Sequence, residues 1–138
     1  MEYAINGLLE IALKYKDKER NLDNALKYAM LASTLSYSPR ADVCCTIGEI
    51  YLEKGNELWA SFWYEKALNN FNVGIDEELP ESEYSTIIPM LKLCFIEHKM
   101  GNVARAKEYN DAVLIIQPDN EIALNNKKEL ENLVTKES

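Results

Sequence analysis

Apolar residues recur at intervals of three and four positions over nearly the whole chain. This spacing places side chains on one face of an α-helix, and no segment has the pattern of a convincing β-strand. The first two apolar stripes are Leu8, Ile11, Ala12 and Tyr15, followed by Leu22, Ala25, Tyr28, Ala29 and Ala32. The pattern therefore predicts an all-α fold.

Capping and helix-ending residues divide the rest of the chain into five further helices. Ser38-Pro39 offers a capping residue followed by proline at the first helical position, and Gly55 can adopt the left-handed conformation that ends a helix at Lys54. Asn56 and Asp119-Asn120 are capping candidates for the helices that follow them. We expect the five helices to end near Lys54, Phe71, Met100, Gln117 and Lys136.

Two of the expected helix pairs share one residue pattern. Units that begin at Ala41 and Ile87 both have a small residue at position 8, Gly at 15 and Ala at 20. These residues are Gly48, Gly55 and Ala60 in one unit and Cys94, Gly101 and Ala106 in the other. The pattern resembles the tetratricopeptide (TPR) repeat of about 34 residues, which also has the proline found here at Pro118. Small residues at positions 8 and 20 would let the two helices of a repeat approach closely, with Ala60 facing Gly48.

The first helix pair fits the same repeat with one extra residue in its charged connection. We expect repeats at about residues 5–39, 41–74 and 87–120, an acidic insertion at 75–86, and a capping helix at about 120–136. The insertion is expected to be an exposed connector or an added helical turn. Three repeats with a polar terminal helix are about the minimum for a stable right-handed α-solenoid, so a single domain is predicted.

The net charge and the lack of long apolar runs argue against two classes of function, nucleic-acid binding and membrane spanning. The 138 residues contain 23 Asp plus Glu against 15 Lys plus Arg, a net charge of −8. This acidic balance disfavours general nucleic-acid binding, which needs cations against the phosphate backbone. No run approaches the roughly 20 apolar residues of a membrane span and no secretory leader opens the chain, so a cytoplasmic location is expected.

Residues with catalytic or metal-binding chemistry are few and dispersed. Cys44, Cys45 and Cys94 form neither a disulfide framework nor a zinc motif, and the five glycines are too far apart for a phosphate-binding loop. The single histidine, His98, has no partner that the sequence places beside it. The acidic insertion lacks the ordered oxygen ligands of a calcium loop. We expect no catalytic residue, metal or cofactor.

In a TPR array, the first helix of each repeat lines a concave groove. The expected lining is Leu9, Leu13, Cys45, Glu49, Leu52, Leu91, Lys92, Phe95 and His98. Some TPR domains bind the C-terminal carboxylate of chaperones through Lys, Arg and Asn side chains at fixed positions. Only Lys92 retains a positive charge at one of these positions, so a helix or hydrophobic segment is the better ligand. The alternative is that the terminal helix or simple packing covers these residues.

The expected helix from Asn56 to Phe71 is apolar almost all the way round. Once the contacts within the stack are assigned, the convex side retains Trp59, Phe62 and Trp63. Each large aromatic side chain can bury about 150–250 Å². The combined area of the three is therefore larger than the few hundred Å² of apolar patch that a monomer usually exposes. Either the acidic insertion or another domain or subunit is therefore expected to cover them.

Several segments resemble a more specific family. They are Ala41-Asp-Val-Cys-Cys-Thr-Ile-Gly-Glu-Ile-Tyr-Leu, Ser61-Phe-Trp-Tyr-Glu-Lys-Ala-Leu, Ile88-Pro-Met-Leu-Lys-Leu-Cys, Glu108-Tyr-Asn-Asp-Ala and Gln117-Pro-Asp-Asn. Over about residues 22–135 the chain is similar to the C-terminal TPR region of bacterial family 2 glycosyltransferases. In that family a preceding GT-A domain binds the nucleotide sugar and the metal. The resemblance therefore implies dimerisation or acceptor presentation and carries no catalytic residue to this chain.

The sequence thus predicts a non-catalytic module for protein–protein interaction or dimerisation. The expected partner is a protein or peptide, a second copy of the chain, or an adjacent glycosyltransferase domain. A small cytosolic chaperone that holds a hydrophobic peptide or helix in the groove is the alternative. A free-standing enzyme is the third class, and it lacks support from any motif.

Overall fold

The computed structural model describes residues 2–35, 39–69 and 83–137, and this part of the chain is helical without a strand. Its elements are α1 (Glu2–Asp17), α2 (Leu22–Thr34), α3 (Ala41–Glu53), α4 (Glu57–Asn69), the 3₁₀ turn η2 (Glu83–Ser85), α5 (Ile87–Lys99), α6 (Val103–Ile116) and α7 (Glu121–Glu137). The predicted all-α class is confirmed.

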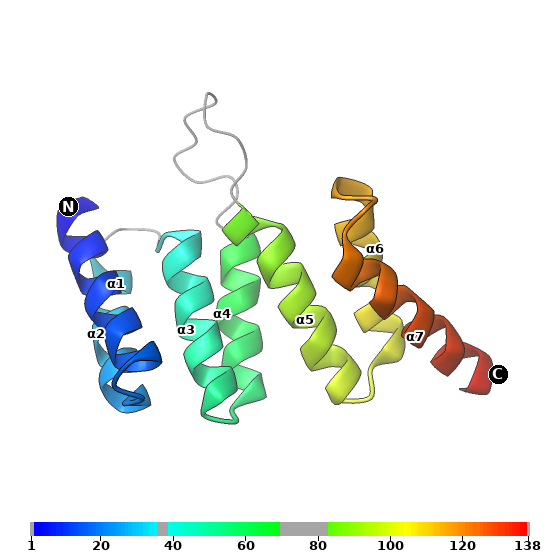
Figure 1. Ribbon diagram of the computed structural model, residues 1–138, viewed down its shortest axis with the longest axis horizontal. Helices are drawn as coiled ribbons and strands as arrows, with labels where there is room; N and C mark the ends of the chain where they lie inside the picture. Colours follow the sequence, from blue (N-terminus) through cyan, green and yellow to red (C-terminus); the bar gives the residue numbers. More distant parts are fainter. Residues whose placement is uncertain (1, 36–38, 70–82, 138) are drawn as a thin grey trace.

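The helices are arranged as a row of antiparallel pairs. The main contacts join α1 to α2, α3 to α4, and α5 to α6, while α7 packs on α6. Neighbouring pairs meet through α2 with α3 and α4 with α5. Figure 1 shows this row running across the molecule, with the two chain ends at opposite sides. Contacts within a pair are therefore the most extensive, and contacts between neighbouring pairs join the pairs into a row.

The sequence predicted several helix ends correctly because the signals are local. Gly55 and Gly101 follow the ends of α3 and α5 with φ angles of 80° and 86°, in the left-handed region that glycine tolerates best. Asn56 caps α4 by accepting a hydrogen bond from the Trp59 backbone N–H at 3.1 Å. Asn120 caps α7 in the same way through the Ala123 N–H at 2.9 Å.

Two boundaries differ from the expectation or fall outside the described residues. Helix α3 begins at Ala41 with Arg40 as its capping residue, so Pro39 precedes the helix rather than opening it, and Ser38 is not described. The Arg40 guanidinium donates to both Asp42 carboxylate oxygens, at 3.0 and 2.6 Å, across the first turn of α3. The predicted end of α4 at Phe71 also lies outside the described residues.

Most of the predicted acidic insertion lies outside the described residues, which resume at Glu83. From there η2 leads into α5, whose first turn contains Pro89. Proline fits this turn without a kink, because the first backbone N–H groups of a helix have no acceptor within it.

The closest approach between α3 and α4 occurs at Gly48. A Cβ atom added there would lie 2.9 Å from two ring carbons of Tyr64, a side chain that is fully buried. The sequence correctly predicted a small residue at this crossing but placed Ala60 opposite it. In the structure the ring of Tyr64 lies against Gly48, because the flat ring fills the space that the missing side chain leaves.

Candidate functional site

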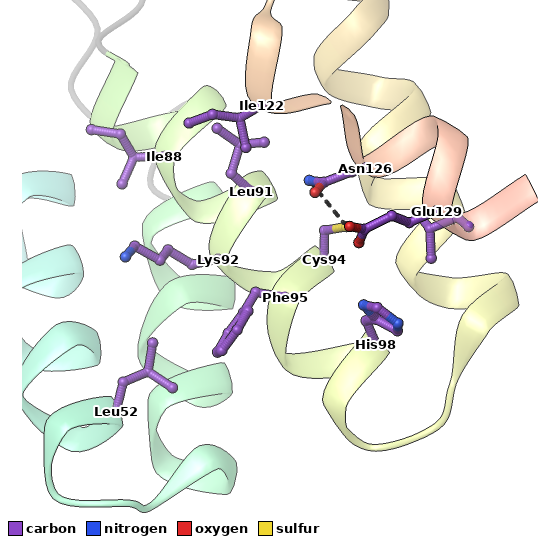
Figure 2. Close-up of a pocket in the computed structure, with 11 residues that line it drawn as sticks. Leu52, Ile88, Leu91, Lys92, Cys94, Phe95, His98, Ile122, Asn126 and Glu129 are labelled. Carbon is purple, nitrogen blue, oxygen red and sulfur yellow. Dashed lines mark hydrogen bonds between the residues drawn. The ribbon is translucent and has the colours of Figure 1, made fainter. Parts of the chain in front are cut away.

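A pocket of about 560 Å³ lies between the end of α3, one face of α5 and one face of α7. We call it the α5–α7 pocket. Its lining residues are Leu52 from α3, Ile88, Leu91, Lys92, Cys94, Phe95 and His98 from α5, and Ile122, Asn126, Glu129 and Leu130 from α7. Figure 2 shows these side chains around the hollow.

Helix α5 forms the floor because it has apolar residues on two faces. Leu93 and Ile96 are fully buried and pack into the core of the helical row. Leu91 and Phe95, which are four residues apart and therefore share a face, line the pocket instead. The Phe95 side chain is 56% exposed, so its ring is available to a partner.

Helix α7 forms one wall, held in place by buried amide groups. The Asn110 side chain is completely buried, and its Nδ2 donates to the Ala123 carbonyl oxygen at 2.8 Å. Its Oδ1 accepts from Asn126 Nδ2 at 3.2 Å. Leu130 packs beside Cys94 in the adjoining apolar cluster. These contacts fix α7 beside the pocket.

Two charged side chains lie on opposite sides of the α5–α7 pocket. Figure 2 shows Lys92 on the side of Leu52, whereas Glu129 extends from α7 on the side of His98. Neither Lys92 nor Glu129 has an ion-pair partner in the described parts of the chain. The pocket therefore combines an apolar floor with one unpaired charge of each sign.

The structure brings five of the nine predicted groove residues together. Leu52, Leu91, Lys92, Phe95 and His98 all line the α5–α7 pocket. They come from α3 and α5, whose sequence positions the repeat pattern aligned.

The other four predicted groove residues lie elsewhere. Leu9 packs partly against the core and Leu13 is 37% exposed on α1. The Glu49 carboxylate forms an ion pair with Lys16 at 3.2 Å. Cys45 is 5% exposed and its thiol donates to the Tyr84 carbonyl oxygen at 3.1 Å, so it offers no surface to a ligand.

The sequence interpretation missed Cys94 and the α7 side of the pocket. The missed α7 residues are Ile122, Asn126, Glu129 and Leu130. Their spacing of four, three and one residues places them on one helix face, which was the available signal. The sequence predicts the terminal helix only as a cap or cover, whereas it also forms one wall of the α5–α7 pocket.

The predicted aromatic surface on α4 is present in part. Leu58, Trp59 and Phe62 are 73%, 51% and 48% exposed, and we call them the α4 aromatic surface. The Trp59 and Phe62 rings meet edge to face with centroids 5.5 Å apart, and Lys66 Nζ lies 5.6 Å from the Phe62 centroid. Trp63 does not belong to this surface, because it is 8% exposed and joins the core.

The three thiols are kept in their neutral form. Burial raises the pKa of Cys44 and of Cys45 to about 12, and that of Cys94 to about 11. Low thiolate content makes them poor nucleophiles at neutral pH. Among the described residues, no group of three or more His, Cys, Asp or Glu side chains is placed to hold a metal ion.

None of the described helices combines the length and apolar character needed to cross a bilayer. Comparisons of the chain with protein-family models and with curated proteins found no match. The site must therefore be interpreted from its own geometry.

Proposed function

We propose that the chain is a TPR protein-interaction module that binds a hydrophobic segment of a partner protein in the α5–α7 pocket. The observation that carries this proposal is the pocket itself, with a volume of about 560 Å³ and a floor formed by Leu91 and Phe95. The volume falls within the range of roughly 300–1,000 Å³ typical of ligand sites.

The helical row supports the TPR interpretation. Equivalent turns at Gly55 and Gly101 have the same left-handed backbone, and each is followed by the second helix of a pair. Contacts within each pair, together with smaller contacts between successive pairs, are the organisation expected of stacked repeats.

The dimensions of the pocket favour a helical segment. Ile88 and His98 are ten positions apart on α5, which is about 15 Å along the helix axis. A partner helix of about three turns spans this distance, and an amphipathic helix that places its apolar face in a hydrophobic groove is a common recognition mode. Covering a half-exposed phenyl ring contributes on the order of 1–2 kcal/mol.

The proposal is tested with a neutral amphipathic peptide of about 16 residues that carries a Leu stripe at helical spacing and Gln elsewhere. We expect saturable binding by calorimetry, and about tenfold weaker binding to Phe95→Ser because the central apolar contact is lost. Ile115→Ser is the matched control, since Ile115 is 82% exposed and lies outside the pocket. No saturable binding, or equal weakening by both substitutions, contradicts the proposal.

The sequence resemblance extends the proposal to a parent protein. As part of a bacterial family 2 glycosyltransferase, the module would dimerise the enzyme or present its acceptor. A small cytoplasmic chaperone is the alternative use of the same pocket. Co-purification of a hydrophobic peptide that Phe95→Ser fails to retain favours the chaperone.

Self-association is the second candidate function, and the α4 aromatic surface is the observation that favours it. Leu58, Trp59 and Phe62 are exposed side by side on one helix. A second copy that covers this surface would remove large aromatic groups from water.

A further inference from the structure

The α5–α7 pocket is lined by two charged side chains that form no ion pair within the described parts of the chain. Lys16 pairs with Asp17 at 2.6 Å, and Lys99 pairs with Glu57 at 2.6 Å. Lys92 and Glu129 have no such partner among the described residues, although both line the pocket. Both pocket charges are therefore available to a ligand.

An entirely apolar occupant would bind at a cost. It would displace water from the Lys92 ammonium and the Glu129 carboxylate without replacing the lost hydrogen bonds. An occupant with a carboxylate beside Lys92 and a cation beside Glu129 would restore both interactions, and it would leave the apolar floor for its own apolar side chains. Complementary charges therefore favour one kind of partner.

Building on the proposed binding function, we propose that the partner is an amphipathic helix with opposite charges on the two sides of its apolar stripe. Its acidic side lies beside Lys92, its basic side lies beside Glu129, and the apolar stripe covers Leu91 and Phe95. Figure 2 shows the two charged side chains on opposite sides of the pocket, as this arrangement requires. The charges select the partner and the apolar floor supplies affinity.

The test uses three variants of the neutral probe with the same Leu stripe. One carries Glu on both sides of the stripe, one carries Lys on both sides, and one carries Glu on one side and Lys on the other. Binding is measured at about 0.15 M salt, where screening limits attraction from distant charges. The wild-type protein should bind the mixed peptide about five- to tenfold more tightly than either of the others, in whichever direction the helix lies.

Charge reversal should change the preferred peptide. Lys92→Glu should prefer the peptide with Lys on both sides of the stripe, because both sides of the pocket are then acidic. Glu129→Lys should prefer the peptide with Glu on both sides. The controls Lys128→Glu and Glu108→Lys make the same changes in net charge at exposed positions outside the pocket, and they should keep the preference for the mixed peptide.

The outcomes separate this proposal from the one on which it rests. Binding of the neutral and mixed peptides with equal affinity, or an unchanged order of preference in both charge-reversed variants, overturns the charge proposal while the hydrophobic binding function stands. If none of the four peptides binds, both proposals fail.

Discussion

The α5–α7 pocket and the α4 aromatic surface both expose apolar side chains, but they are built differently. The pocket is assembled from three helices, and its α7 wall depends on the buried Asn110 side chain. The residues of the α4 aromatic surface all come from one helix, and the Trp59 and Phe62 rings meet edge to face. One surface thus depends on tertiary packing and the other on local helical spacing.

This difference has a practical consequence. Changes that loosen the helix packing should remove the pocket while leaving the α4 aromatic surface exposed. Changes on the α4 aromatic surface should leave the pocket intact, since Trp59 and Phe62 lie outside its lining. The two surfaces are therefore separable by substitution.

The largest effect is expected for Gly48→Ala, which affects the packing beneath both surfaces. The new Cβ would lie 2.9 Å from the Tyr64 ring, and a buried ring has little room to move. We expect a loss of about 2–3 kcal/mol in the free energy of unfolding, measured by urea denaturation.

Gly7→Ala is the matched control for that substitution. A Cβ at Gly7 meets no atom within 4 Å, and alanine favours the helix, so we expect a gain of about 0.5–1 kcal/mol. Equal effects at Gly7 and Gly48 would show that the close approach to Tyr64 does not limit the packing.

Asn110→Ala should weaken the α5–α7 pocket without changing the α4 aromatic surface. It removes the side-chain hydrogen bonds to the Ala123 carbonyl and from Asn126, so the α7 wall loosens. We expect about 1–2 kcal/mol lower stability and weaker binding of the neutral peptide. Asn125→Ala, at an exposed position on α7, is the control and should change neither quantity. Unimpaired peptide binding by Asn110→Ala would mean that the wall does not depend on this network.

The three buried cysteines should make the stability of the fold depend on pH. Burial raises the pKa of Cys44 and Cys45 from 9.0 to about 12, and that of Cys94 to about 11, so the folded state retains protons that the unfolded state releases. Their contribution to stability is therefore complete below about pH 9 and decreases as the pH rises toward 11–12. Iodoacetamide labelling followed by mass spectrometry should modify Cys94 first as the pH rises. Earlier labelling of Cys45 would contradict the lower pKa of the Cys94 thiol.

The smallest change in stability is expected on the α4 aromatic surface. Trp59→Ser and Phe62→Ser replace half-exposed rings, so each should lower the free energy of unfolding by no more than about 1 kcal/mol. Pocket binding should be unchanged. If this surface joins two copies, light scattering after size-exclusion chromatography should show fewer dimers for both variants. A wild-type protein that is monomeric at all concentrations would exclude the self-association function.

Local signals in the sequence predicted the helical frame well. Glycine at positions 55 and 101 and asparagine at 56 and 120 act through their own backbone or within one turn, so their roles follow from residue type. The start of α3 is predicted two residues too early, because Arg40 rather than Ser38 is the capping residue and Pro39 precedes it.

Contacts between helices could be predicted less well. The sequence indicated close packing at Gly48 but not that the Tyr64 ring fills the space, since helix rotation decides which residue lies opposite. For the same reason Trp63 was expected on the surface and is buried in the core. The α7 wall was missed because its apolar and polar residues share one face, and only the packing on α6 shows that this face lines a pocket.

The central claim is that the α5–α7 pocket, rather than the α4 aromatic surface, is where a hydrophobic partner segment binds. Methyl-labelled protein titrated with the neutral peptide tests it most directly by nuclear magnetic resonance. The predicted result is a saturable shift of the Ile88, Leu91 and Ile122 methyl signals, with the Leu58 signals unchanged. Shifts confined to Leu58, with the pocket methyl groups unaffected, would contradict the claim.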